Sequence, residues 1–193
     1  MNLIHRYLCR STSWRRVLRD YVVPWVLSDA QFGSHLVELG PGHGLTTDLL
    51  RPHVAHLTAL EIDPVLANSL AARFSGTNVT VVRGDATAMP FPRAHFSAAV
   101  SLHMLHHIHD ADLQNQLFRE VCRVLKPGAI FVGVDSVGLN NFWMRLIHIG
   151  DTLVPVDPDS IGSRLESAGF QNISVKTNPH AFRFHALRPA AGL

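Results

Sequence analysis

Residues 35–44, His-Leu-Val-Glu-Leu-Gly-Pro-Gly-His-Gly, decide the fold of this chain. The apolar run at residues 36–39 predicts a short buried strand, and three glycines follow it at alternate positions, Gly40, Gly42 and Gly44. Glycine allows a tight turn in which the backbone can approach a ligand closely. Residues 45–50 then begin a helix. A glycine turn between a strand and a helix is a common site for nucleotide-like ligands.

Strand-like and helix-like segments alternate along the rest of the chain. Apolar runs predict further strands at residues 57–62, 78–82, 96–102 and 129–134. Apolar residues at helical spacing predict helices at residues 64–74, 112–125 and 159–168. The last two strands, residues 173–177 and 182–187, are joined by a tight turn and are expected to pair antiparallel. This order predicts an α/β fold with a doubly wound, mostly parallel sheet.

The chain is expected to form a single domain over residues 1–193, because 193 residues with 47% hydrophobic side chains can bury one core. Residues 1–34 are expected to form a helical cap, whose apolar face Pro24 should kink or split. Residues 136–158 interrupt the alternation and are expected to form an insertion that acts as a substrate lid.

Composition excludes several classes of protein. The net charge is only +2 and no run of like charge stands out, so a nucleic-acid groove is not expected. Two distant cysteines, Cys9 and Cys122, favour a reducing interior over a disulfide scaffold. The first residues do not resemble a signal peptide, and no apolar run reaches the roughly 18 residues of a membrane span. A cytoplasmic protein without an integral membrane segment is therefore expected.

Two acids follow strands at the edge where open α/β sheets bind ligands. Glu61 ends the second predicted strand, and a carboxylate there can accept both hydroxyl protons of a ribose. The alternative is a solvated acid that starts a helix, but its apolar neighbours make burial without a partner costly. Asp85 follows the third predicted strand, where it would either accept a hydrogen bond from an adenine amine or serve as a turn residue.

Five motifs in register resemble those of the class I S-adenosylmethionine-dependent methyltransferases, and most closely the small single-domain group called methyltransferase type 11. The resemblance covers residues 36–134. It rests on Glu38-x-Gly40-x-Gly42-x-Gly44, Glu61-Ile62-Asp63-Pro64, Gly84-Asp85-Ala86, Met89-Pro90-Phe91 and Leu125-Lys126-Pro127-Gly128. It implies a Rossmann-like, seven-stranded sheet with an antiparallel last strand and S-adenosylmethionine as the cofactor. One departure is Ser97, where the family often has an acid; that position is structural.

The resemblance also implies a role for each matching position. The glycine turn and Glu38 would hold the amino acid end of the cofactor, Glu61 the ribose hydroxyls, and Asp85 the adenine amine. The adenine ring would pack on one side chain, and the methionine part would lie near the end of the fourth strand. The implied cofactor-binding residues are Glu38, Gly40, Gly42, Gly44, Glu61, Ile62, Asp85, Ala86 and Ser101.

Four histidines crowd the segment that follows the fourth predicted strand: His103, His106, His107 and His109. No carboxylate or cysteine pattern completes a zinc site, so no metal is expected. An acid–base role fits better, with His106 as the candidate general base and Asp135, at the end of the neighbouring strand, orienting its imidazole. The alternative is that these histidines simply pack, bond to backbone or face solvent.

Other functions remain open on the sequence. A nicotinamide-dependent oxidoreductase would carry Gly-x-Gly-x-x-Gly, whereas Leu45 occupies the position of its last glycine here. A cofactor-binding or non-catalytic domain that acts through a protein partner is a second alternative. The acceptor is expected to be a small apolar or aromatic molecule, since the cap and the insertion offer Trp14, Trp25, Phe142 and Trp143. The oligomeric state is not indicated.

Overall fold

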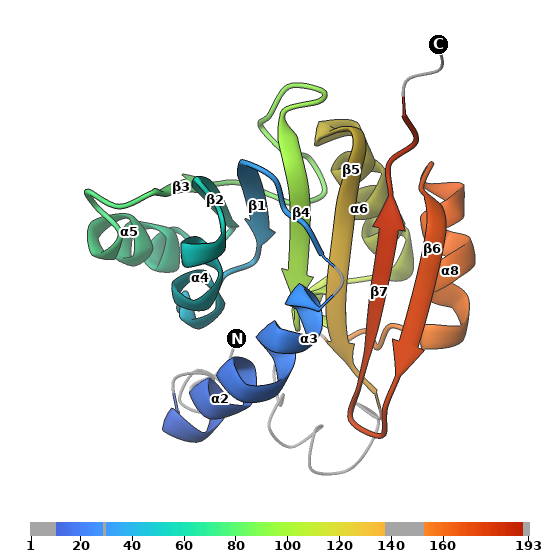
Figure 1. The fold of residues 1–193 in the computed structure, drawn as a ribbon, viewed down its shortest axis with the longest axis horizontal. Coiled ribbons are helices and arrows are strands. Elements are labelled where there is room, and N and C mark those ends of the chain that lie inside the picture. The colour runs from blue at the N-terminus through green and yellow to red at the C-terminus, as the bar shows by residue number, and fades with distance from the viewer. Residues whose placement is uncertain (1–10, 29, 138–152, 191–193) are drawn as a thin grey trace.

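The computed structural model describes residues 11–28, 30–137 and 153–190. These residues form one seven-stranded sheet in the order β3-β2-β1-β4-β5-β7-β6 (Figure 1). The strands are β1 (His35–Leu39), β2 (His56–Glu61), β3 (Val79–Arg83), β4 (Phe96–Leu102), β5 (Leu125–Ser136), β6 (Gln171–Thr177) and β7 (Ala181–Leu187). Strands β1 to β5 pair in parallel, and β7 runs antiparallel to β5 and β6. The predicted Rossmann-like, seven-stranded sheet with an antiparallel last strand is confirmed.

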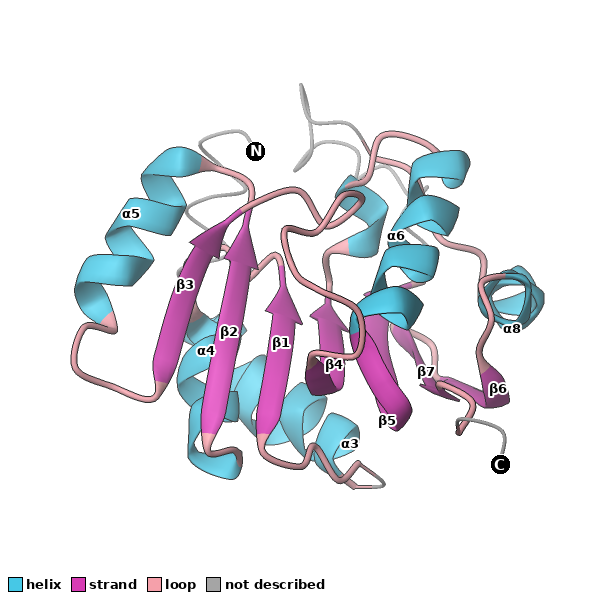
Figure 2. Cartoon of the chain, turned by 90° about the horizontal axis from the view of Figure 1, so that it is seen from above, coloured by secondary structure: helices cyan, strands magenta, loops and turns pink. Residues whose placement is uncertain are grey.

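Helices cover both faces of the sheet (Figure 2). One face carries α2 (Thr12–Val17), the π-helical η1 (Leu18–Val22), α3 (Val23–Leu27), α4 (Leu45–Leu50) and α5 (Pro64–Arg73). The other face carries α6 (Ala111–Val124) and α8 (Pro158–Ser167). Two short 3₁₀ turns, η2 (Arg51–His53) and η3 (Leu105–His107), complete the described elements.

Aspartates cap the helices α5 and α6, which follow β2 and β4. Asp63 accepts hydrogen bonds from the backbone N–H groups of Val65 and Leu66, at 2.8 and 3.1 Å, and Pro64 occupies the first turn of α5. Asp110 accepts from the N–H of Leu113 at 2.7 Å and caps α6. Such caps satisfy N–H groups that have no partner within the helix. They fix where α5 leaves β2 and so help to shape the carboxyl edge of the sheet.

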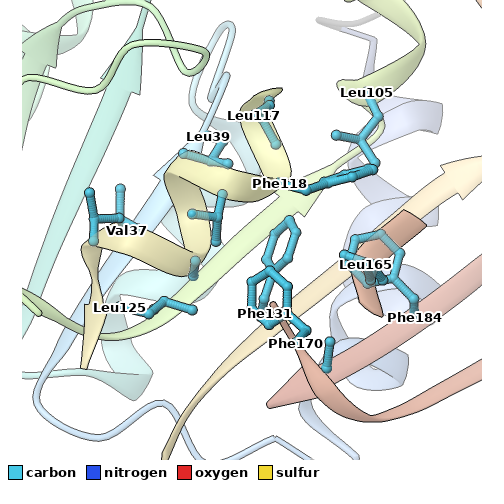
Figure 3. Packing of buried hydrophobic residues seen from close by; sticks show 14 of the residues in the cluster. Val37, Leu39, Leu105, Leu117, Phe118, Leu125, Phe131, Leu165, Phe170 and Phe184 are labelled. Carbon is cyan, nitrogen blue, oxygen red and sulfur yellow. The ribbon is translucent and has the colours of Figure 1, made fainter. Parts of the chain in front are cut away.

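The core on the α6 and α8 face is built around phenylalanines (Figure 3). The rings of Phe131 and Phe184 meet edge to face, with centroids 4.9 Å apart. A Cβ atom at Gly133 would lie 2.1 Å from the Phe184 ring, so glycine is needed where β5 passes this side chain. This packing fixes antiparallel β7 against β5 and closes the half of the sheet that lies away from the glycine turn.

Strand β5 is longer than predicted. It begins at Leu125, directly after α6, whereas the sequence predicts residues 129–134. The pairing with β4 shifts register between Phe96 and Ala98, so the Lys126-Pro127-Gly128 segment is accommodated as an irregularity within the strand. Proline and the left-handed φ of +77° at Gly128 explain why the sequence suggests a break at this point.

The predicted N-terminal helix spans Thr12 to Leu27 and changes character just before Pro24. Proline has no N–H to donate to the residue four positions earlier. The helix widens into the π-helical turn Leu18–Val22 immediately upstream, and the N–H of Val23 bonds to the carbonyl of Leu18.

The helical cap and the single domain stay predictions. Most of the predicted lid, with Phe142 and Trp143, falls in residues 138–152, outside the described residues.

Candidate active site

The three glycines after β1 all have left-handed backbone conformations, with φ of +62° at Gly40, +57° at Gly42 and +71° at Gly44. A Cβ atom at Gly40 would lie 2.4 Å from the Met104 side chain, and one at Gly44 would lie 2.6 Å from Leu70. At Gly42, by contrast, no described atom lies within 4 Å of such a Cβ. The outer two glycines therefore allow close packing of the protein, while Gly42 faces open space that a ligand can fill.

Glu38 connects the two elements that flank this turn, β1 and α4. It is buried in β1, and its two carboxylate oxygens accept hydrogen bonds from the hydroxyl groups of Thr46 and Thr47 at the start of α4, the latter at 2.6 Å. Burial raises the pKa of Glu38 to about 7, although the two hydroxyl hydrogen bonds act to lower it. Glu38 thus ties β1 to α4 across the glycine turn.

Glu61 holds the turn from the neighbouring strand. This buried residue ends β2; one carboxylate oxygen accepts from the N–H of Gly42 and the other from the N–H of Asp63, both at 3.0 Å. Burial raises the pKa of Glu61, and the backbone hydrogen bonds lower it. The N–H of Gly40 also donates to the carbonyl of Leu60 at 2.9 Å. Hydrogen bonds from Gly40 and Gly42 therefore connect the end of β2 to the glycine turn that follows β1.

The residues beyond β2 and β3 offer an apolar platform and a further carboxylate. Ile62 is 64% exposed directly after Glu61, which is unusual for a large aliphatic side chain. Asp85 is exposed, and its Oδ1 accepts from the N–H and the hydroxyl of Thr87, both at 2.8 Å. Within the described residues its Oδ2 makes no hydrogen bond. Ala86 follows Asp85 and packs partly against the core.

Ser101, the residue before the last in β4, has a buried hydroxyl that makes no hydrogen bond. It pairs in register with Leu39 of β1, so it lies next to the glycine turn. Buried polar atoms without a partner are uncommon and call for an explanation. A ligand at the carboxyl edge of β1 and β4 would supply the missing partner.

A buried histidine–aspartate pair lies at the same edge. Nδ1 of His106 lies 2.5 Å from Oδ1 of Asp135, and the N–H of His106 also donates to Asp135 at 3.2 Å. His106 is 3% exposed and Asp135 is fully buried. Burial acts to raise the pKa of Asp135, but His106, His103 and the N–H of Ser136 together lower this pKa below its usual value. The structure therefore brings together the predicted base and the predicted orienting carboxylate.

His103 is a further polar group at this edge, and the sequence did not single it out from the histidine cluster. It has a left-handed φ of +53°, which is uncommon outside glycine. Its Nδ1 lies 3.1 Å from the hydroxyl of Ser136, its Nε2 is buried without a hydrogen bond, and its ring meets Trp14 edge to face at 5.1 Å. Burial lowers the pKa of His103 to about 4, so the ring is neutral at pH 7. His109, in contrast, is exposed.

A cleft of about 440 Å³ lies beside the turn, between Gly42 and His43 on one side and α5 on the other. Arg15 of α2 and Val65 of α5 line its rim. Among the described residues, no group of three or more His, Cys, Asp or Glu side chains is placed to hold a metal ion.

The fold and these motifs define a family. Residues 37–133 match the methyltransferase domain family, and this segment covers half of the chain. The protein therefore belongs to that family, whose members of class I use S-adenosylmethionine. The structure is also similar to the crystal structure of a SAM-dependent methyltransferase from Aquifex aeolicus, with a TM-score of 0.76, 16% sequence identity and coverage of 97% of this chain and 99% of that one.

Curated relatives match parts of their own length. The chain is 25% identical over 182 residues to 2-methyl-6-phytyl-1,4-hydroquinone methyltransferase 1, chloroplastic, from Oryza sativa subsp. japonica, which covers 91% of this chain and 52% of the relative. It is 43% identical over 70 residues to an rRNA adenine N-6-methyltransferase of Streptomyces fradiae, covering 35% of this chain and 22% of the relative. The chain thus spans at most about half the length of these relatives. Along the part of the chain that the structure describes, no helix is long and apolar enough to cross a bilayer.

Glu38 provides a test of the turn that needs no ligand. In the folded protein the pKa of Glu38 is about 7, above its ordinary value of 4.5. Protonated Glu38 therefore contributes its full stabilisation below about pH 4.5, and this contribution is lost as the pH rises through 7. This pKa shift corresponds to about 3 kcal/mol in the free energy of unfolding. The Glu38→Gln variant has no such titration, so its unfolding free energy should change less between pH 4.5 and 7.5 than that of the unaltered protein.

Urea unfolding at several pH values measures this difference. Glu166→Gln, at an exposed position of α8, is the matched control and should leave the pH dependence unchanged. Parallel pH profiles for the unaltered protein and the Glu38→Gln variant would show that Glu38 does not titrate in this range.

Proposed function

We propose that this protein transfers a methyl group from S-adenosylmethionine to a small acceptor with an apolar or aromatic part. The observation that carries the proposal is the turn at Gly42, where a left-handed backbone meets open space and is locked in place by Glu61. Membership of the methyltransferase domain family supports the same cofactor.

The residues present fit this cofactor. Glu61 and Asp85 each keep lone pairs that would accept hydrogen bonds from ribose hydroxyls and from the adenine amine. Exposed Ile62 would pack on the adenine ring, with the backbone at Ala86 on its edge. The Gly40–Gly44 turn would approach the amino acid end, and the free hydroxyl of Ser101 would lie near the methionine part. Glu38 would act through the turn that it braces.

The chemistry needs positioning more than acid catalysis. S-adenosylmethionine, when bound, supplies a methyl group on a positively charged sulfur whose leaving group is a neutral thioether. The protein would hold the acceptor in line behind that methyl and exclude water. For a hydroxyl or carbon-acid acceptor, His106 would take the proton at Nε2 while Asp135 holds Nδ1. His103 and Ser136 lie beside this pair.

The acceptor class is supported by two observations. Trp14 and Trp25 of the N-terminal helix are only half-buried, and Trp14 contacts His103 at the carboxyl edge. The relative that matches 91% of this chain is a methyltransferase of a hydroquinone with a phytyl group. An acceptor with an aromatic head and an apolar tail fits such a surface better than an RNA does, although a shorter segment matches an rRNA methyltransferase.

Transfer of labelled methyl groups tests the proposal. The purified chain is incubated with methyl-labelled S-adenosylmethionine and, separately, with an organic-solvent extract, a polar metabolite extract and total RNA. We expect label in the organic-solvent extract and none in RNA. Label only in RNA or in the polar extract would contradict the acceptor class. Bound cofactor without transfer to any pool would favour a domain that acts through a protein partner.

A further inference from the structure

The outer face of the N-terminal helix combines exposed apolar residues with arginines. No residue of α2 is buried. Val17 is 39% exposed and Tyr21 is 73% exposed, and they are two of the four large hydrophobic side chains that the described structure leaves exposed. The other two, Ile62 and Val65, lie at the proposed cofactor edge. Nothing in the proposed cofactor site explains Val17 and Tyr21.

Charge is distributed unevenly around this helix. Residues 1–19 contain five arginines and no acidic residue, whereas the rest of the chain has more acidic than basic side chains. Three of these arginines, Arg15, Arg16 and Arg19, are exposed on the described helix beside Val17. Nε of Arg19 lies 2.6 Å from Oδ1 of Asp20, but both side chains are exposed, and an exposed ion pair contributes little to stability. The face therefore remains basic.

The far end of the same helix is fixed to the body of the protein. Val22, Val23 and Val26 are buried in the core of this face. Arg183 of β7 donates to the carbonyl of Trp25 at 2.5 Å and to the hydroxyl of Ser28 at 3.0 Å. The helix thus has a rigid base at α3, while α2 projects at the edge to which the arrowheads of β4 and β5 point (Figure 1).

We propose that the outer face of α2 and η1 docks on the surface of an anionic phospholipid membrane. A helix with aromatic and aliphatic side chains between arginines lies in the plane of such an interface, with the apolar groups in the headgroup region and the guanidinium groups on lipid phosphates. Each basic side chain near the surface adds to the binding until salt screens it. Val17 and Tyr21 enter the interface, and Arg16 contacts phosphate.

Docking would place the carboxyl edge of the sheet close to the bilayer, because Trp14 on the inner side of the same helix touches His103. A lipid-embedded acceptor would then reach the site without crossing bulk water; that consequence rests on the proposed function. The membrane contact itself does not, since it needs neither cofactor nor acceptor.

Vesicle flotation with the full chain tests the proposal. The vesicles consist either of phosphatidylcholine alone or of phosphatidylcholine with one quarter phosphatidylglycerol. We expect binding to the anionic vesicles in 0.1 M salt, and at least about tenfold weaker binding both to neutral vesicles and in 0.5 M salt. Arg16→Glu, which reverses a charge, should weaken binding to anionic vesicles about tenfold. Tyr21→Ser should weaken it several-fold.

Arg119→Glu is the matched control, because it makes the same charge change at an exposed position of α6 on the opposite face of the sheet. It should bind anionic vesicles as the unaltered protein does, and circular dichroism shows whether each variant is folded. Equal binding to neutral vesicles, equal weakening by Arg119→Glu, or no binding at low salt would overturn the proposal. Salt-sensitive binding to single-stranded RNA without vesicle binding would assign the basic face to nucleic acid instead.

Discussion

The Gly42→Val variant is expected to lose at least about 100-fold in affinity for S-adenosylmethionine while keeping its fold. Gly42 has a φ of +57°, and a side chain there would project into space that no described atom occupies. A branched side chain would fill that space and would strain the left-handed backbone. Isothermal titration calorimetry measures the loss. Glu61→Ala should produce a similar loss, because it removes both the acceptor for the Gly42 N–H and the proposed ribose contact.

Gly76→Val separates strain from ligand exclusion. Gly76 has a φ of +75°, and a Cβ there would also meet no atom within 4 Å, but it lies in the turn between α5 and β3. The two valine variants should lose similar stability, and only Gly42→Val should lose the cofactor. Equal loss of affinity in both would show that general strain, rather than the open space at Gly42, governs binding.

Asp135→Asn is expected to lower the single-turnover rate about 100-fold or more with an acceptor that must lose a proton, and to leave cofactor affinity nearly unchanged. The amide keeps the shape of the side chain but replaces one acceptor oxygen with a donor facing Nδ1 of His106. The imidazole would then be held in the wrong tautomer to take a proton at Nε2.

Rapid-quench measurements with labelled cofactor provide the rate. His109→Ala is a suitable control, since this histidine of the same cluster is exposed. An unchanged rate in the Asp135→Asn variant would remove the pair from catalysis and leave it a buried structural contact. His106→Ala should reproduce the rate loss, at a cost in stability, because it leaves the buried Asp135 without its partner.

Local patterns predicted the fold well because the strands and helices carry their own periodicity, and several of them are bounded by glycine, proline or aspartate. Strand β4 has the bounds that the sequence predicts, and the antiparallel β7 follows from the short turn after β6. The predicted start of β5 was wrong. Lys126-Pro127-Gly128 resembles a segment that separates a helix from a strand, but it lies within β5, where the pairing with β4 shifts register. That outcome depends on the neighbouring strand.

The candidate site was predictable where it follows from the carboxyl edge of a parallel sheet. His106 and Asp135 follow adjacent strands, so their proximity could be inferred, and the structure places them in contact. The hydrogen bonds from Thr46 and Thr47 to Glu38 could not be inferred, because they depend on how the glycine turn folds back. Nor could the left-handed backbone of His103, since no local residue preference favours it. Which residues bind the cofactor remains a prediction.

Calorimetric titration of the unaltered chain tests the central claim most directly. S-adenosylmethionine and a nicotinamide dinucleotide are titrated separately into the same protein. We predict one site per chain for S-adenosylmethionine, with saturable heat, and no measurable binding of the dinucleotide. Binding of the dinucleotide without S-adenosylmethionine, or no binding of either, would contradict the assignment of the Gly42 turn to a methyl donor.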